Sequence, residues 1–238
     1  DGIRAAAIIA VIINHFNKDI LPSGYLGVDI FFVISGYVIT SSIYKRKSKN
    51  FSKFISEFYI RRIKRLVPAL IFFVLCISLL ICFFRSNSSG SLNTGISSLF
   101  GLSNIALFFR SKNYFAPSEA LNPFIHTWSL GVEQQFYLIF PFLVWFTGFG
   151  RHSHKGLRNL FIVISFLLFF SLILFIYLYQ INQPAAYYLI FTRFWEFSAG
   201  CLLFLGFVKK NRLFKYLERI NPLFILLGML GTMFLTNN

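Results

Sequence analysis

The sequence is poor in charged residues, and poorest of all in acidic ones. Only 13% of its 238 residues are charged, against roughly 25% in ordinary soluble domains. Asp and Glu number 8, whereas Lys and Arg number 23. Hydrophobic residues make up 56% of the chain, and the mean hydropathy is +0.67. This composition excludes an ordinary soluble domain and indicates several membrane spans. The basic excess is interpreted as cytoplasmic loop charge beside anionic lipid, and no nucleic-acid partner is expected.

The small number of cysteines and the absence of several common motifs limit the chemistry that this chain can perform. The three cysteines, Cys76, Cys82 and Cys201, lie in apolar runs without a CxxC pair or metal-like spacing, so we expect buried thiols and no metal site. The sequence contains no GxxxxGK[ST], GxGxxG, HExxH or GxSxG motif, which argues against a soluble-type nucleotide site or a serine elbow. An initiator Met is also lacking, and apolar runs reach nearly to both ends. We therefore expect 1–238 to be part of a membrane domain, truncated at both ends, with no soluble domain.

Long apolar runs predict an all-α, polytopic transmembrane helical bundle with about seven crossings. The runs lie near residues 2–17, 25–44, 66–84, 130–148, 159–179, 186–207 and 222–236. An eighth run, 95–110, is short and carries four Ser or Asn residues, so we expect an interfacial or re-entrant segment. If this segment does not cross the membrane, most Lys and Arg residues lie on one side of the bilayer, including nine in a loop at 45–65. The N-terminal side is then cytoplasmic.

Ionisable residues inside these spans are costly and are functional candidates by default. They are Arg4, His15, Asp29, Glu133, Arg193 and Glu196. Arg4 and His15 stand eleven residues apart in "DGIRAAAIIAVIINH". In an α-helix this separation is about 1100° of rotation and about 16 Å of rise, so both lie on one face. The topology places Arg4 toward the inner side of the membrane, and His15, Asp29 and Glu133 toward the outer side.

Structural interpretations of these residues stay open. Arg193 and Glu196 are spaced i,i+3 and can form a simple ion pair. A lone His in a membrane helix often hydrogen-bonds to a neighbouring helix, and Asp29 can cap or pair with one. The cluster Arg61, Arg62 and Arg65 can serve only as a topology determinant.

A second dense stretch is "HTWSLGVEQQFY". His126, Glu133 and Tyr137 recur at spacings of seven and four, which places them on one helical face. Trp128 and Tyr137 also fit an interfacial aromatic role. The consecutive residues Glu133, Gln134 and Gln135 cannot all face lipid cheaply. We expect them to line a cavity or to pack on other polar groups.

These pieces, taken in order, resemble the acyltransferase-3 family of integral membrane acyltransferases. "DGIRAAAIIAVIINH" resembles its first helix with Arg-x10-His, and "GYLGVDIFFVISGYVIT" resembles its second. "FYIRRIKRLVPAL" resembles its Arg-Arg-x-x-Arg pattern. "YFAPSEALNPFIHTWSLGVEQQFYLIFP" resembles the subgroup that O-acetylates bacterial surface polysaccharides. Gln134 stands where many relatives have a second Glu, so no proton chemistry is assigned to it. The resemblance covers most of the first 145 residues and thins afterwards.

The resemblance implies an O-acyltransferase in the bacterial cytoplasmic membrane. Such enzymes move an acyl group, usually acetyl, from cytoplasmic acetyl-CoA to a hydroxyl of an extracytoplasmic glycan. The acceptor is a glycan or lipid-linked glycan: lipopolysaccharide O-antigen, capsule, exopolysaccharide or peptidoglycan. Acetyl-CoA is expected as the donor, membrane lipid as a partner, and no metal. Many such relatives continue into an extracytoplasmic domain.

Roles for single residues follow from the resemblance together with their chemistry. His15 is expected to deprotonate the acceptor hydroxyl or to carry acetyl, with Glu133 or Asp29 orienting it. Clustered arginines suit CoA phosphates, which assigns Arg61, Arg62 and Arg65 to the donor. Arg4 is expected to contact the donor or to stabilise charge on the thioester oxygen. The residues assigned to substrate binding are His126, Trp128, Ser129 and Tyr137.

Other functions also fit these residues. A transporter or channel would move its substrate through the same polar stripe. Transfer of a longer acyl or succinyl group, or transfer to another acceptor, fits the motifs equally well. A purely structural membrane partner fits less well, because six ionisable residues lie within spans.

Overall fold

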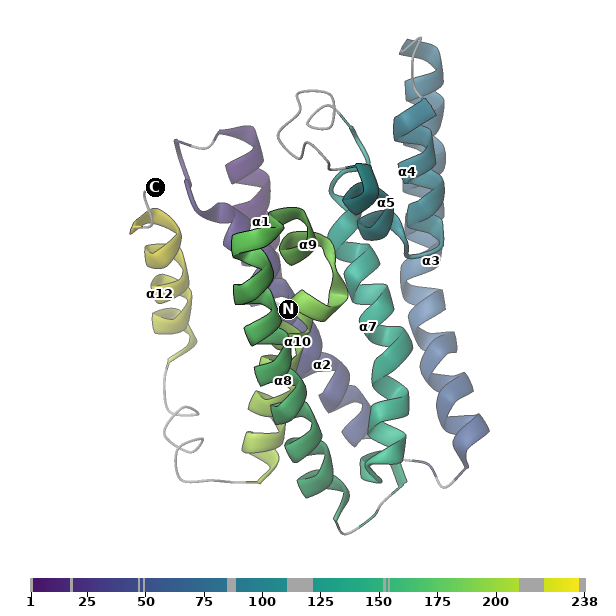
Figure 1. Ribbon diagram of the computed structural model, residues 1–238, viewed down its shortest axis with the longest axis vertical. Coiled ribbons are helices and arrows are strands. Elements are labelled where there is room, and N and C mark those ends of the chain that lie inside the picture. The colour runs from purple at the N-terminus through teal and green to yellow at the C-terminus, as the bar shows by residue number, and fades with distance from the viewer. Residues whose placement is uncertain are drawn as a thin grey trace. The chain divides into compact units, whose positions relative to one another are not determined.

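The computed structural model describes residues 2–17, 19–46, 48, 50–84, 89–110, 122–151, 153, 155–209 and 221–235. Within these ranges the chain is helical and contains no strand, which confirms the all-α class. The chain divides into two compact units. Unit 1 consists of Asp1–Lys45 and Glu196–Asn238, and unit 2 consists of Arg46–Trp195. Each unit is described by itself (Figure 1).

Each apolar run expected to span the membrane contains a helix. Four stretches of the described chain are long and apolar enough to cross a bilayer: Gly24–Tyr44, Phe51–Phe84, Gly156–Ile181 and Gln183–Val208. The helices α1 (Gly2–Phe16) and α12 (Pro222–Leu235) are shorter, with 15 and 14 residues. These features are those of a multi-pass membrane protein. The count of seven crossings stays a prediction.

Unit 1 is held together by close helix contacts at glycine. It contains α1, the short 3₁₀ helix η1 (Gly24–Leu26), α2 (Gly27–Tyr44), α12 and the C-terminal part of α10 (Ile190–Val208). A Cβ on Gly27 would lie 2.3 Å from the Ala7 carbonyl oxygen of α1. A Cβ on Gly200 of α10 would lie 1.8 Å from the Val33 carbonyl oxygen of α2. Small residues thus allow the backbones to approach closely, as is common in membrane bundles.

Unit 2 is organised around two antiparallel helices, α3 (Phe51–Phe84) and α7 (Thr127–Phe146). The Tyr59 hydroxyl donates to the Leu138 carbonyl at 2.9 Å, and farther along α3 Leu70 packs in one cluster with Leu130. Numbers rise along one helix as they fall along the other, so the helices run in opposite directions (Figure 1). The other helices of unit 2 among the described residues are α4 (Ser89–Leu99), α5 (Ser103–Arg110), η3 (Phe149–Arg151), α8 (Gly156–Ile181), α9 (Gln183–Tyr188) and the start of α10.

The loop predicted at 45–65 is wrong for most of its length, because α3 already begins at Phe51. The charges that predicted the loop support the helix instead. Glu57 lies 4.0 Å from the Lys53 ammonium and 3.7 Å from the Arg61 guanidinium, both at i,i+4 spacing. Such pairs stabilise an exposed helical turn by a few tenths of a kcal/mol, about 0.2–0.5 each. Residues 47 and 49 lie outside the described residues.

The run at 95–110 is a helix pair rather than a single segment. α4 ends at Leu99 and α5 begins at Ser103, with Gly101 between them at a φ of 70°. With 11 and 8 residues, neither helix reaches the roughly 20 residues that a crossing needs. The run at 186–207 is likewise divided, because Leu189 is extended between α9 and α10.

Candidate functional site

His15 stands at the C-terminal end of α1 with an exposed ring. Its Nδ1 lies 2.8 Å from the Val11 carbonyl oxygen, one turn earlier in the same helix. Because a carbonyl can only accept, Nδ1 carries the proton in this contact. In the neutral ring Nε2 is then the nitrogen with the lone pair, which is the form a general base requires.

Asn14 fixes the backbone beside His15. Its buried side-chain amide donates to the Leu21 carbonyl at 2.7 Å and to the Pro22 carbonyl at 2.9 Å. These bonds join the end of α1 to the turn that leads into α2. The turn brings Asp29, which is half-buried in the first turn of α2, to the same end of unit 1 as His15. A carboxylate is favoured there by the helix dipole.

Arg4 faces α2 from the opposite end of α1. Its Nη2 donates to the Ser35 hydroxyl at 2.8 Å, and its guanidinium lies 5.0 Å from the centre of the Phe31 ring. Since α1 is one continuous helix, Arg4 and His15 lie on one face about three turns apart, as their spacing predicts. Ser35 was not singled out from the sequence, and it supplies a buried hydroxyl to Arg4.

In unit 2, Glu133 and Tyr137 of α7 form a buried pair linked to Arg62 of α3. The Tyr137 hydroxyl donates to Glu133 Oε1 at 2.5 Å, and the two residues are 6% and 2% exposed. The Arg62 guanidinium lies 4.9 Å from the centre of the Tyr137 ring and 5.7 Å from that of Phe58. The structure therefore brings three predicted site residues together. Tyr137 is the link between the arginine motif and the carboxylate.

The three motif arginines have different surroundings. Arg61 pairs with Glu57 on the exposed side of α3. Arg62 turns toward α7 and stacks on Tyr137. Arg65 is exposed, and among the described residues it makes no ion pair. The three arginines of this motif therefore differ in their contacts.

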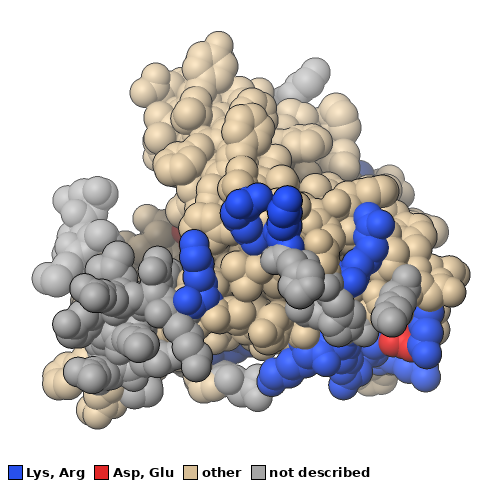
Figure 2. All heavy atoms as spheres, turned by 90° about the horizontal axis from the view of Figure 1, so that it is seen from below, with Lys and Arg blue, Asp and Glu red and all other residues tan. Residues whose placement is uncertain are grey.

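Basic residues gather at the end of unit 2 where α3 begins. The Ser48 amide donates to the Gly150 carbonyl at 3.1 Å, which joins this end to the turn between α7 and α8. In that turn the Arg151 guanidinium lies 4.9 Å from the Trp145 ring. Figure 2, which views the molecule from this side, shows many Lys and Arg side chains with little acidic surface among them.

A polar cluster joins the turn between α4 and α5 to α7 and α9. The Gln135 amide donates to the Gly101 carbonyl at 2.9 Å and to the Asn104 side-chain oxygen at 2.8 Å. The fully buried Asn104 amide donates to the Tyr188 carbonyl at 2.9 Å. Gln135 thus packs on other polar groups, as predicted for the Glu133–Gln135 run. The asparagine in the short apolar run at 95–110 was the sequence signal for this cluster.

Trp128, at the start of α7, lies among other aromatic rings and Arg193. Its ring is 5% exposed and lies 4.4 Å from that of Tyr187. The Arg193 guanidinium lies 4.9 Å from the Tyr187 ring, 5.7 Å from Trp128 and 5.5 Å from Phe175, and Nε donates to the Tyr187 carbonyl at 3.1 Å. Cation–π contacts are worth more when desolvated, as here. Acceptor binding by Trp128 stays a prediction.

His126 and Ser129 lie at the N-terminal end of α7. The basic residues described above lie at the opposite end of this helix. His126 directly precedes the helix and is exposed, and the Ser129 hydroxyl donates to its carbonyl at 3.3 Å. Glu133 and Tyr137 face inward, so His126 differs from them in exposure despite its helical spacing. Residues 111–121, which hold much of "YFAPSEALNP", lie outside the described residues.

The structure therefore places Arg4, His15 and Asp29 in unit 1, and the other predicted site residues in unit 2. A family model described as an acyltransferase domain matches residues 1–238. The chain belongs to the acyltransferase-3 family. The resemblance drawn from its motifs is thereby confirmed, and it extends over the C-terminal part of the chain as well.

Curated relatives of this family member include O-acetyltransferase OatA of Staphylococcus aureus (strain NCTC 8325 / PS 47). It is 34% identical over 204 residues, which are 85% of this chain and 33% of that protein. Peptidoglycan O-acetyltransferase OatA of Listeria monocytogenes serovar 1/2a (strain ATCC BAA-679 / EGD-e) is 35% identical over 206 residues, again 85% and 33%. The chain thus spans about a third of the length of these relatives. No solved structure matches it significantly.

Proposed function

We propose that the full-length protein is a membrane-embedded O-acetyltransferase that moves acetyl from acetyl-CoA to hydroxyl groups of peptidoglycan. Family membership and the names of the relatives support acetyl transfer, and the Listeria relative supports this acceptor. The observation that carries the proposal is the state of His15. Its ring is exposed at the end of α1, and Nδ1 is engaged by the Val11 carbonyl.

In the proposed reaction, His15 Nε2 takes the proton from the acceptor hydroxyl. The hydroxyl oxygen attacks the thioester carbonyl carbon, and the carbon–sulfur bond breaks to release the CoA thiolate. The proton then passes from His15 to that thiolate, so products are the acetyl ester and CoA. A carboxylate such as Asp29, at the same end of unit 1, favours the imidazolium formed during the reaction. Arg4 is positioned along the same face of α1 to meet negative charge on the donor.

We place the protein in the bacterial cytoplasmic membrane. In the proposed orientation, the helix ends that carry most of the Lys and Arg residues face the cytoplasm. In unit 1, the 18 residues of α2 separate the turn that follows α1 from Lys45. This is about 27 Å of helix, close to the thickness of a bilayer core. The positive-inside rule then assigns Lys45 to the cytoplasmic side and His15 to the outer side.

Cysteine labelling tests this orientation. In a background without native cysteines, Asp19→Cys in the turn after α1 should react with an impermeant maleimide on intact cells. Lys155→Cys, in the turn between α7 and α8, should react only after the cells are permeabilised. The reverse pattern would refute the orientation without touching the assignment of acetyl transfer.

The function itself is tested with the full-length protein, reconstituted with acetyl-labelled acetyl-CoA and a peptidoglycan fragment. Wild type should label the glycan, and His15→Gln should lower the rate by about 10²–10⁴-fold, the usual worth of a general base. Asn17→Gln, two residues on and exposed, is the matched control and should keep the wild-type rate. Wild-type activity in a well-inserted His15→Gln protein would refute the catalytic role. A transporter would bind or move the substrate and leave the glycan unlabelled.

A further inference from the structure

The turn between α7 and α8 in unit 2 carries basic residues without acidic neighbours. Arg151 lies in this turn, Lys155 directly precedes α8 and Arg158 lies in its first turn, and all three are exposed. Among the residues that the structure describes, none of the three forms an ion pair. The sequence from Gln134 to Trp195 contains no Asp or Glu. Their charge is therefore not balanced by acidic residues of the adjoining helices.

The turn is closed tightly by two glycines. The amides of Arg151 and Ser153 both donate to the Gly148 carbonyl at 3.2 Å, and the Gly156 amide donates to the Ser153 carbonyl at 3.0 Å. A Cβ on Gly156 would lie 2.6 Å from the Gly148 carbonyl, so the two glycines are in backbone contact. The loop that carries Arg151 therefore stands beside the first turn of α8.

Arg151 is held in place on its inner side. Its Nε donates to the Trp145 carbonyl at 3.1 Å, and its guanidinium lies 4.9 Å from the centre of the Trp145 ring. The two Nη groups are left as donors, and these can bind phosphate oxygens in bidentate fashion. A side chain that is already ordered loses little conformational entropy when it binds a ligand.

The first turn of α8 also favours an anion from outside the chain. The N-terminal end of a helix carries partial positive charge, and cations there are unfavourable. Lys155 and Arg158 nevertheless occupy this end, and the first turn contains no acidic residue. A bound anion relieves this repulsion.

An exposed apolar stripe continues from Arg158 along the same face of α8. At successive spacings of four, four, three and four residues it contains side chains that are each more than half exposed: Ile162, Phe166, Phe169 and Ile173. From Ile162 to Ile173 the helix rises about 16 Å, about half of a hydrocarbon core of roughly 30 Å. The stripe thus presents positive charge first and then apolar surface as long as one leaflet.

We propose that the turn between α7 and α8 binds the headgroup of one anionic glycerophospholipid, whose acyl chain lies along this stripe. The phosphodiester accepts from Arg151 and Arg158, and Lys155 adds positive charge. The inference rests on the proposed orientation, which places the turn in the cytoplasmic leaflet. It goes beyond general attraction of a basic surface to lipid, because a headgroup site and a chain site adjoin on one helix.

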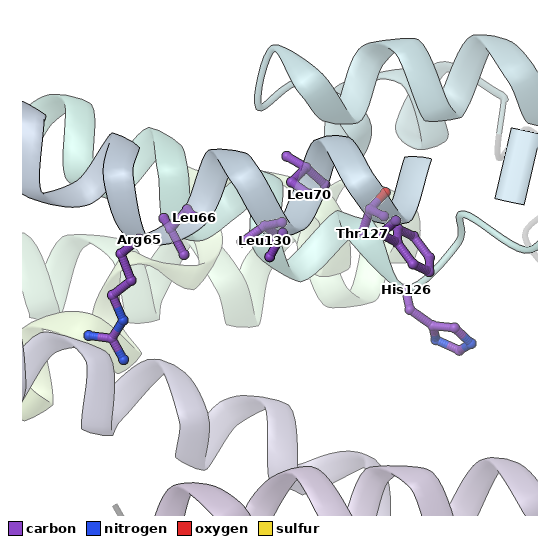
Figure 3. A pocket seen from close by; sticks show the side chains of 8 residues that line it. Arg65, Leu66, Leu70, His126, Thr127 and Leu130 are labelled. Carbon is purple, nitrogen blue, oxygen red and sulfur yellow. The ribbon is translucent and has the colours of Figure 1, made fainter. Parts of the chain in front are cut away.

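This surface is distinct from the arginine motif of α3. The motif residue Arg65 lines an apolar groove of about 350 Å³ on α3 and α7, with His126 at its other end (Figure 3). None of the three basic residues of the turn lines that groove. The lipid site can therefore be altered without changing the motif.

Native mass spectrometry of the full-length protein in detergent tests the site. The probes are dioleoylphosphatidylglycerol and dioleoylphosphatidylcholine, which share their acyl chains and differ in net charge. Arg151→Gln/Arg158→Gln should weaken binding of the phosphatidylglycerol by about 25-fold, about fivefold for each charge removed, and leave binding of the phosphatidylcholine unchanged. Lys53→Gln/Lys64→Gln removes the same charge from exposed positions of α3 and should keep the wild-type affinity. Equal weakening in both variants would show diffuse attraction and overturn the proposal.

Arg158→Gln alone guards against a loosened turn, because no hydrogen bond within the described chain depends on this side chain. It should weaken binding of the phosphatidylglycerol by about fivefold with an unchanged Tm in detergent. Unchanged lipid affinity in this variant would contradict the assignment of the headgroup to Arg158.

Thermal unfolding in nanodiscs supplies a second measurement. The Trp145 ring lies 5.1 Å from that of Phe51 and 5.4 Å from that of Phe54, so Arg151 supports the junction of α7 with α3. Phosphatidylglycerol should raise the Tm of wild type relative to phosphatidylcholine alone, and Arg151→Gln/Arg158→Gln should lose this difference. The same rise in both proteins would refute the site.

Competition separates a lipid from a soluble anion. Glycerophosphoglycerol, the headgroup without chains, should not displace the phosphatidylglycerol at equal concentration, and neither should CoA. Displacement by either compound would identify a site for soluble phosphate esters and overturn the lipid assignment. These measurements need no acetyl transfer, so failure of the lipid site and failure of the proposed function are distinguishable.

Discussion

The link between Tyr137 and Glu133 gives the sharpest test of the site in unit 2. Tyr137→Phe keeps the ring, and with it the stacking under Arg62, and removes only the hydroxyl that donates to Glu133 at 2.5 Å. Both residues are almost fully buried, so water cannot readily replace the lost donor. A hydrogen bond to a charged group is worth about 1.5–3 kcal/mol. At about 1.4 kcal/mol per tenfold, its loss corresponds to about 10–150-fold if Glu133 acts in the reaction.

The assay is acetyl transfer by full-length protein, with kcat and KM for acetyl-CoA measured separately and Tm measured in detergent. We expect Tyr137→Phe to lower kcat by about 10–150-fold and to leave KM nearly unchanged, because the hydroxyl donates to the Glu133 carboxylate. Tyr59→Phe is the matched control. Its hydroxyl donates to the Leu138 carbonyl at 2.9 Å at an exposed site on the same helix pair, so kcat should stay near wild type.

Arg62→Gln tests separately whether Arg62 acts on Glu133 through Tyr137. Because the guanidinium stacks on Tyr137, the two substitutions should be non-additive in kcat, as expected for residues that act through one contact. A lowered Tm with wild-type kcat in Tyr137→Phe would show that the pair is only structural. Additive losses in the double variant would refute the coupling of Arg62 to Glu133 through Tyr137.

Three further predictions concern stability, each measured as Tm of the purified protein. Gly200→Ala should lower Tm by an amount equivalent to about 1–3 kcal/mol, because its Cβ would meet the Val33 carbonyl at 1.8 Å; Gly228→Ala, with nothing within 4 Å, should not lower it. Asn104→Leu should cost about 1–3 kcal/mol by leaving buried partners unsatisfied, whereas the exposed Asn93→Leu should be near neutral. Asn14→Ala should cost a similar amount by releasing two carbonyls of the turn after α1, and an unchanged Tm there would refute the role of those bonds.

The helices of this protein were largely predictable, because the length of an apolar run is a local property of the chain. Each expected run contains a helix, and the breaks that were missed have local causes. Gly101 has a φ of 70° between α4 and α5, and Leu189 is extended between α9 and α10. The error at 51–65 arose because charge was taken as the mark of a loop. On a helix, Lys53, Glu57 and Arg61 form i,i+4 pairs instead.

The sequence by itself determined the membrane class, the shared face of Arg4 and His15, and the family, since each depends on residue order and helical spacing alone. Only the tertiary structure decided which partner each polar side chain takes. One arginine of the motif forms an ion pair, a second stacks on Tyr137 and the third is exposed, while Asn104 joins Gln135 and Tyr188 across three helices. Such choices depend on the rotation and register of packed helices. Contacts such as Gly200 against Val33, formed by residues far apart in the chain, set that packing.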